Sequence, residues 1–215
     1  GPFAESVYQC VESIPEGDLQ QAILAERNRR LFQHLVAQPL KSPPEILTER
    51  TRMRAHRVED FPAMTAMWAE EAVVRFILGR PSAPSETWSR LLRYIGHWQA
   101  VGFGYWAVED RQTGEYLGDT GFADYQREIT PPLGNVPEAG WALVSTAQGK
   151  GLATEVVKAA HDWADANFLT ERTVAIFDPS HEGSVRVAEK CGYVRSHDAS
   201  FMDKPTLVMQ RFRPA

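Results

Sequence analysis

The spacing of apolar residues changes several times along the chain and predicts a succession of helices and strands. Between residues 18 and 38, apolar side chains recur at steps of three and four, which predicts an amphipathic helix. Prolines at positions 39, 43 and 44 end this helix and form a linker. We therefore expect a helical extension with its linker over residues 1–45 and a main domain over residues 46–215. The helix is expected to brace the core or to mediate a dimer contact, and a lid over a substrate is the alternative.

The main domain is predicted to open with a strand and two helices. A strand-like alternation runs from residue 47 to 54, and Asp60 can cap a helix that begins at Phe61 and Pro62. Ser85 can open the second helix. We expect the inner side of that helix to carry a buried apolar stripe, formed by Trp88, Leu91, Leu92, Ile95 and Trp98.

The rest of the chain is rich in strand signals. A turn at residues 111–114 joins two strands as a hairpin, and a proline-rich connection leads to a strand that Glu138 heads. Two helices follow, one from about residue 152 and one that ends at Gly192, with a short strand between them. Two further strands come last. The order of elements is therefore mixed, with a meander of strands followed by a strand-helix-strand-helix-strand run.

Composition and charge exclude several classes of function. The 215 residues, 43% of them hydrophobic and 24% charged, are ordinary for a soluble globular protein. A net charge of -5 argues against a nucleic-acid groove. No apolar run approaches the roughly 20 residues needed to cross a bilayer, and the start does not read as a signal peptide. Gly1 and Pro2 are interpreted as the remnant of a tag. We predict neither a nucleic-acid partner nor a membrane partner.

The two cysteines and six histidines indicate no disulfide framework and no metal site. Cys10 and Cys191 are too few for such a framework, and Cys191 is interpreted as a small buried hydrophobic residue. The histidines are scattered without the spacing of metal ligands. These features fit a reducing, cytoplasmic setting.

Residues 147–155, AQGKGLATE, lie where a strand-like run becomes a helix. They form neither a Walker loop nor a dinucleotide fingerprint, because the Lys-Ser/Thr pair and the third glycine are missing. Gly149 and Gly151 let the backbone approach a ligand closely. The start of the helix directs free N–H groups to the same place, and Lys150 can add charge at the rim. The segment predicts an anion site, with an ordinary glycine-rich helix start as the alternative.

Together with its surroundings, this segment resembles the GCN5-related N-acetyltransferase (GNAT) superfamily, in particular its branch of ribosomal-protein N-terminal acetyltransferases. The resemblance rests on the strand PEAGWALV before the loop and on SVRVAEKCGY after the next strand, and it extends roughly over residues 46–212. It implies the α/β (α+β) GNAT fold, a mixed and mostly antiparallel central sheet flanked by helices, here with an added N-terminal helix. It also implies acetyl-CoA as cosubstrate and no metal.

The resemblance also assigns the residues that bind acetyl-CoA. The family's loop for the cofactor pyrophosphate matches Gln148, Gly151 and Ala153, and the strand before it would pair with the pantetheine arm. His181 stands where the family usually has asparagine. It can still make one hydrogen bond near the pantetheine, and a proton shuttle is the alternative role. The implied cofactor-binding residues are Leu143, Val144, Gln148, Gly149, Lys150, Gly151, Leu152, Ala153, Thr154 and His181.

The implied reaction is direct attack of an amine on the thioester. Deprotonating an amine with a pKa of about 10.4 at pH 7 costs about 4.6 kcal/mol, whereas deprotonating an α-amino group costs only about 1 kcal/mol. Glu138 matches a residue that often acts as the base in the family, commonly through water; its alternative is a solvated carboxylate. Ser184 could protonate the leaving thiolate or be a simple helical hydroxyl. Tyr193 lies nearby in the sequence and is interpreted as a core residue.

Our first hypothesis is therefore an acetyl-CoA-dependent N-acetyltransferase. A protein or peptide N-terminus ranks ahead of a small amine such as a polyamine or an antibiotic as the acceptor. Phe76 is assigned to the acceptor cleft, with a core aromatic as the alternative. A CoA-binding regulatory domain without turnover and an enzyme for a longer acyl donor remain alternatives, and a homodimer is possible.

Overall fold

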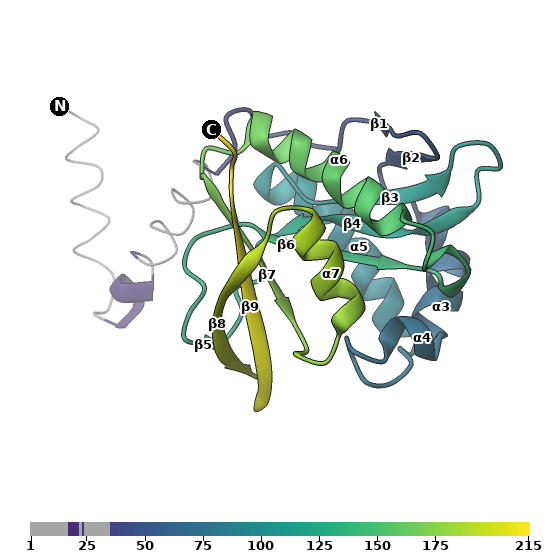
Figure 1. Ribbon diagram of the computed structural model, residues 1–215. Helices are drawn as coiled ribbons and strands as arrows, with labels where there is room; N and C mark the ends of the chain where they lie inside the picture. Colours follow the sequence, from purple (N-terminus) through teal and green to yellow (C-terminus); the bar gives the residue numbers. More distant parts are fainter. Residues whose placement is uncertain (1–16, 22, 24–34) are drawn as a thin grey trace. The chain divides into compact units, whose positions relative to one another are not determined.

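The computed structural model describes residues 17–21, 23 and 35–215 (Figure 1). Contacts divide the chain into two units, residues 1–34 and residues 35–215. In the first unit, residues 17–21 and 23 are helical, as predicted. Most of the other residues of the predicted helix, and Cys10, lie outside the described residues. The division of the chain at residue 45 stays a prediction.

The predicted helix is wrong at its C-terminal end. Residues 35–38 form a turn and bends instead of a helix. Val36 forms an antiparallel bridge with Phe168, and the Leu169 N–H donates to the Leu35 carbonyl at 2.9 Å. Leu35 and Val36 are each only 2% exposed. Their backbone groups thus bond to the chain that follows helix α6 (Leu152–Asn167), which leaves none for a further helical turn.

A nine-stranded sheet forms the centre of the second unit, in the order β1-β2-β3-β4-β6-β7-β9-β8-β5. Neighbouring strands are antiparallel except for β6 and β7, which are parallel. The strands are β1 (Ile46–Leu47), β2 (Thr51–Arg54), β3 (Tyr105–Asp110), β4 (Tyr116–Ala123), β5 (Ile129–Thr130), β6 (Glu138–Leu143), β7 (Arg172–Phe177), β8 (Val194–Phe201) and β9 (Lys204–Phe212).

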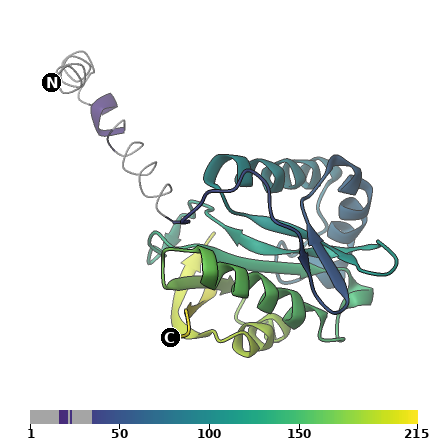
Figure 2. The same cartoon turned by 90° about the horizontal axis from the view of Figure 1, so that it is seen from above.

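Helices cover both faces of this sheet, so the predicted mixed fold is confirmed. Figure 2 shows α3 and α5 on one side of the strands and α6 and α7 on the other. The helices are η1 (Val58–Asp60), α3 (Phe61–Ala69), α4 (Glu71–Val74), α5 (Pro84–Val101), η2 (Ser145–Ala147), α6 (Leu152–Asn167) and α7 (Glu182–Lys190). Among the residues that the structure describes, none of these helices is long and apolar enough to span a membrane.

The buried side of α5 differs from the predicted stripe. Leu91 and Trp98 are buried as expected, at 0% and 1% exposure, and they share their face with Thr87 and Tyr94. These four positions follow the helical steps of four, three and four. The other three predicted core residues lie on the outer flank and are partly exposed: Trp88 at 39%, Leu92 at 46% and Ile95 at 38%.

A buried ion pair fastens the start of α3 to the sheet. Arg54 on β2 donates Nη2 to Asp60 Oδ1 at 2.8 Å and Nη1 to Asp60 Oδ2 at 3.0 Å, while its Nε donates to Glu109 at 2.7 Å. Asp60 also accepts from the Arg57 N–H at 2.9 Å. Burial raises the pKa of Asp60, but the bonds from Arg54 and Arg57 outweigh it and hold the pKa below its usual value.

Asp60→Asn is therefore expected to lower the free energy of unfolding by about 3 kcal/mol at pH 7, since it leaves part of a buried ion pair without its partner. Because the folded-state pKa of Asp60 is lowered, its stabilisation is present above the unfolded pKa and is lost as pH falls through the folded value. The difference between wild type and variant in urea unfolding should therefore shrink in acid. Glu45→Gln, in the half-exposed pair with Arg52, should have no measurable effect. An equal loss in both variants would contradict the assignment.

Candidate functional site

The strands β6 and β7 separate from each other and leave one backbone edge of β6 free in the middle of the sheet. They pair only where Glu138 lies opposite Val174. The rest of β6 keeps its pairing with β4, from Ala123 opposite Glu138 to Gly118 opposite Leu143. On its other edge, the described strands offer no partner beyond the Glu138 contact. Such an edge can bind an extended ligand as an added strand.

The loop after β6 turns this edge into an anion site. Gly149 and Gly151 have φ angles of +74° and +77°, which favour glycine, and Gly151 is the N-cap of α6. The N-terminal N–H groups of α6 and its positive dipole end meet there. The Gln148 side chain donates Nε2 to the Leu143 carbonyl at 3.0 Å and so ties the loop to the end of β6. The structure thus brings the predicted residues 143–144 and 148–154 together.

Two contacts to this region were missed by the sequence analysis. Arg50, in the turn between β1 and β2, donates Nη1 to the Lys150 carbonyl and Nε to Glu155 Oε1, both at 2.9 Å. Glu70 Oε2 accepts from the Ser145 N–H at 3.0 Å. The Arg50 guanidinium therefore borders the loop. The Glu70 carboxylate already accepts a hydrogen bond from one N–H group of the loop, that of Ser145. Neither residue belongs to a local motif, and their partners lie 100 and 75 positions away along the chain.

Glu138 is buried and ion-paired at the start of β6. It is 6% exposed, and Arg127 donates Nε to Oε1 at 2.6 Å and Nη2 to Oε2 at 2.8 Å. Burial raises the pKa of Glu138, and the Arg127 guanidinium opposes the rise without cancelling it. The alternative of a solvated strand-end carboxylate does not hold. The role of a base stays a prediction.

Phe76, His181 and Ser184 come together at the start of α7. The rings of Phe76 and His181 stack at a centroid distance of 4.6 Å and an angle of 17°. His181 Nε2 lies 3.2 Å from Ser184 Oγ. Burial lowers the pKa of His181, although Asp178 opposes this, so the ring is neutral at pH 7. Phe76 is only half-buried and is therefore available to a ligand on this side.

Tyr193 is a core residue, as interpreted from the sequence. It is 2% exposed, and its hydroxyl lies between His161 Nε2 at 2.8 Å and Thr173 Oγ1 at 2.9 Å. Both partners are themselves buried. The phenol is therefore committed to an internal network and is not free to serve a ligand. Cys191 is likewise buried, at 8% exposure.

Polar residues that sequence reasoning did not single out lie beside Gly140 and Ala142 of β6, on the same face of the sheet. The Tyr105 hydroxyl lies over Gly140, where any side chain would collide with it, and it accepts from the Tyr125 hydroxyl at 3.0 Å. Asp119 lies opposite Ala142 in the register of β4 and β6 and is 1% exposed. Tyr105 and Asp119 occur in ordinary strand patterns and Tyr125 in the loop after β4, so no local signal marks them.

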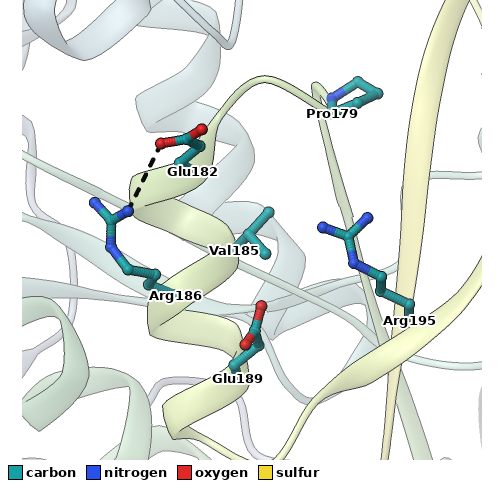
Figure 3. Close-up of a pocket in the computed structure, with 6 residues that line it drawn as sticks. All are labelled: Pro179, Glu182, Val185, Arg186, Glu189 and Arg195. Carbon is teal, nitrogen blue, oxygen red and sulfur yellow. Dashed lines mark ion pairs between the residues drawn. The ribbon is translucent and has the colours of Figure 1, made fainter.

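A surface hollow beside α7 is separate from these groups. Figure 3 shows its lining, in which Glu182 and Arg186 form an ion pair at 3.8 Å. None of the predicted site residues lines it. The lining residues are Pro179, Glu182, Val185, Arg186, Glu189 and Arg195. Within the described part of the chain, no cluster of three or more metal-ligating side chains occurs.

Comparisons with known proteins identify relatives of this arrangement. A sequence model of the family described as "Acetyltransferase (GNAT) domain" matches residues 50–194. The uncharacterized protein YkkB of Bacillus subtilis (strain 168) is 33% identical over 113 residues, which are 53% of this chain. The match spans 63% of YkkB, less than two thirds of the length of that protein.

Solved structures share the architecture. A putative GnaT-family acetyltransferase from Bordetella pertussis is 29% identical, with a TM-score of 0.70 over 79% of this chain and 99% of that one. RimL, a ribosomal L7/L12 alpha-N-protein acetyltransferase solved in complex with coenzyme A, is 14% identical, with a TM-score of 0.63 over 79% of this chain and 98% of that one. The likeness to RimL shows the fold alone.

Arg127→Gln should raise the pKa of Glu138 further, because burial would then act without the guanidinium. It should also lower the free energy of unfolding by about 3 kcal/mol at pH 7. Since a carboxyl with a raised folded-state pKa favours the folded state below that pKa, the variant should regain stability as pH falls. Carboxyl NMR titration and urea unfolding measure the two effects. Arg93→Gln is the matched control, because Arg93 also lies over the Tyr125 ring, at 5.3 Å against 4.3 Å for Arg127. A pKa of Glu138 that is unchanged in Arg127→Gln would contradict the assignment.

Proposed function

Since this chain belongs to the GNAT acetyltransferase family, we propose that it transfers the acetyl group of acetyl-CoA to a primary amine by direct attack of the amine on the thioester. A protein or peptide N-terminus is our first acceptor class. The observation that carries the proposal is the free edge of β6, which runs directly into the glycine turns and the N-terminus of α6. An extended arm and an anionic group on one ligand match this sequence of features.

The residues that would hold acetyl-CoA fit its chemistry. The backbone of Leu143 and Val144 would pair with the pantetheine amides, and the N–H groups of residues 149–154 would face the pyrophosphate. Lys150 is exposed at the rim, and Arg50 adds a second cation beside the loop. The bound cosubstrate supplies an activated acetyl group; a backbone N–H at the edge of β6 could stabilise negative charge on its carbonyl oxygen.

The acid and base roles fall to one group on β6 and one on α7. Glu138 lies at the start of β6 and would accept a proton from the attacking nitrogen. Ser184, in contact with the neutral His181 ring, would donate a proton to the departing sulfur. In this arrangement His181 accepts from the Ser184 hydroxyl or orients it. This keeps one hydrogen bond at a position where the family usually has asparagine.

We base the acceptor ranking on the resemblance to ribosomal-protein N-terminal acetyltransferases; proton energetics agree with it. An α-amino group needs only about 1 kcal/mol to become neutral at pH 7, much less than a lysine-like amine. Phe76 stacks on His181 and is half-buried, so it can contact the residue next to the amine. We assign the activity to the cytoplasm, in keeping with the low cysteine content. A homodimer stays a possibility for the whole chain.

A CoA-binding domain without turnover is the second candidate. The bidentate pair of Glu138 with Arg127 favours it, because both carboxylate oxygens are already used by charge-assisted hydrogen bonds. Against it stands the contact between Ser184 and His181, which supplies a proton donor at the start of α7.

The full chain mixed with acetyl-CoA should release free thiol when a suitable amine is added. At pH 7 we expect faster release with N-terminal peptides than with polyamines or aminoglycosides, since more of an α-amino group is neutral. Thiol detection across the three panels measures this directly. Tight acetyl-CoA binding in calorimetry without thiol release in any panel would favour the domain without turnover.

With a true acceptor, Glu138→Gln should lower kcat about 100-fold. Ser184→Ala should have a smaller effect, because a thiolate with a pKa of about 8.5 leaves readily. Ser196→Ala is the matched control, since Ser196 also contacts a histidine ring, at 2.8 Å from His197 Nδ1, and lies outside the site. Unchanged kcat in Glu138→Gln would remove the base assignment, and unchanged kcat in Ser184→Ala would remove the acid assignment.

A further inference from the structure

A buried polar cluster lies between α5 and the sheet, and its hydrogen bonds are incomplete. We call it the Asp119 cluster. Asp119 Oδ2, the Tyr116 hydroxyl and both ring nitrogens of His56 are buried without a hydrogen-bond partner in the described part of the chain. Native proteins satisfy the large majority of buried polar side-chain atoms. The members of the cluster are His56, Tyr94, Tyr105, Tyr116, Asp119 and Tyr125.

The rings of the cluster touch one another around the Asp119 carboxyl. His56 lies 4.7 Å from the Tyr94 ring and 6.4 Å from the Tyr116 ring, and Tyr94 stacks on Tyr105 at 4.7 Å. Tyrosine faces of this kind attract a cation. Four orphaned polar atoms inside an aromatic wall indicate a place that a polar ligand completes, because leaving such atoms unpaired costs stability.

The cluster lies over the face of the sheet that contains Gly140 and Ala142 of β6, the strand with the free edge. Asp119 is opposite Ala107 on β3 and Ala142 on β6. The other β6 residue on this face near it is Gly140, over which the Tyr105 hydroxyl lies. No side chain larger than alanine therefore separates Asp119 from the edge at this level of β6. Neighbouring strands are about 4.8 Å apart, so one small group over β6 can contact both sides.

Asp119 supplies the carboxyl of the cluster, and the guanidiniums of Arg90 and Arg93 lie near it. Burial raises the pKa of Asp119 to about 7, although Arg90, Tyr94 and Arg93 oppose the rise. Burial lowers the pKa of His56 to about 3, so its ring is neutral. At the Tyr125 side of the cluster, Arg127 lies over the Tyr125 ring and pairs with Glu138. The titratable or charged groups facing Asp119 are Arg90, Arg93 and Tyr94 of α5, Tyr105 of β3 and Tyr116 of β4.

We propose that the Asp119 cluster binds the amino group of the acceptor over β6 and that Asp119 takes the first of the two protons which that nitrogen loses. This inference rests on the proposed function. An N–H bond of the ammonium breaks and an O–H bond forms at Asp119 Oδ2. The freed lone pair attacks the thioester carbon, the C–S bond breaks, and the sulfur keeps the electron pair. Glu138 takes the second proton from nitrogen. Ser184 passes its proton to the sulfur and regains one from solvent, to which the two carboxyls return theirs, so that the turnover releases one proton in all.

The shared chemistry is a primary amino group, and its source decides between the acceptor classes. A peptide N-terminus and a small aliphatic amine present the same group to Asp119. They differ in the rest of the molecule attached to that group, which would lie toward Tyr125 and Arg93 at the more exposed side of the cluster. The experiment therefore includes both kinds of amine as separate arms.

Asp119→Asn should lower kcat/KM for the preferred amine about 100-fold at pH 7. It should also remove from the pH profile the rise near pH 7, while the rise that belongs to the amine itself remains. The affinity for acetyl-CoA should not change in calorimetry. Tyr116→Phe should lower kcat/KM without lowering the melting temperature, because it deletes an unpaired hydroxyl. Asp162→Asn, an exposed aspartate of α6 on the other face of the sheet, is the control and should match wild type.

Carboxyl NMR of the full chain provides a readout that needs no turnover. The Asp119 resonance, assigned by comparison with Asp119→Asn, should titrate near pH 7 and should shift when a peptide or spermidine is added. If wild type releases no thiol with any amine, the proposed function fails. If it does release thiol but Asp119→Asn keeps the wild-type pH profile, the inference alone fails. An Asp119 resonance that no amine shifts also overturns the inference and leaves ordered water as the partner of the orphaned atoms.

Discussion

One parallel contact, between Glu138 and Val174, interrupts a sheet whose other neighbours all pair antiparallel. Parallel neighbours require a crossover connection, and here the crossover is the loop after β6 followed by α6. Because the two strands separate after this contact, the backbone of β6 stays free up to the point where the chain turns into the helix. The free edge and the helix N-terminus are therefore two results of a single topological step.

A second constraint acts on the face of β6 that carries Gly140 and Ala142, because only small side chains fit there. Gly140 admits the Tyr105 hydroxyl, and Ala142 leaves room beside Asp119. A β-bulge in β4 contributes as well: Val108 pairs with Gly118 but Glu109 pairs with Tyr116, so Leu117 has no opposite residue. The bulge turns Tyr116 to the same side as Ala107 and Ala123, in one cluster with Tyr94 and Tyr105.

Much of this arrangement could be predicted because it is local. The glycines at 149 and 151, the helix after them and the strand before them are read from neighbouring residues, and the mixed fold follows from the order of elements. Periodicity was less reliable on α5, where it predicted a buried stripe that is partly on the outer flank. It also failed after residue 34, where pairing with residues 167–169 replaces the predicted helix. Arg50, Arg127 and Asp119 could not be found, since each acts through a contact that only the folded sheet creates.

Glu138 and Asp119 share one face of the sheet, and burial raises the pKa of both carboxyl groups, but their partners differ. Arg127 gives Glu138 two short hydrogen bonds, which fix its orientation and favour its charged form against burial. Asp119 has no such partner on Oδ2. Arg90, Tyr94 and Arg93 offset burial only in part, so its pKa rises to about 7 and its two protonation states are close in energy near neutral pH. Burying the charged form of this carboxyl costs stability. A carboxyl kept there at that cost, beside a free strand edge, is what proton exchange near pH 7 requires.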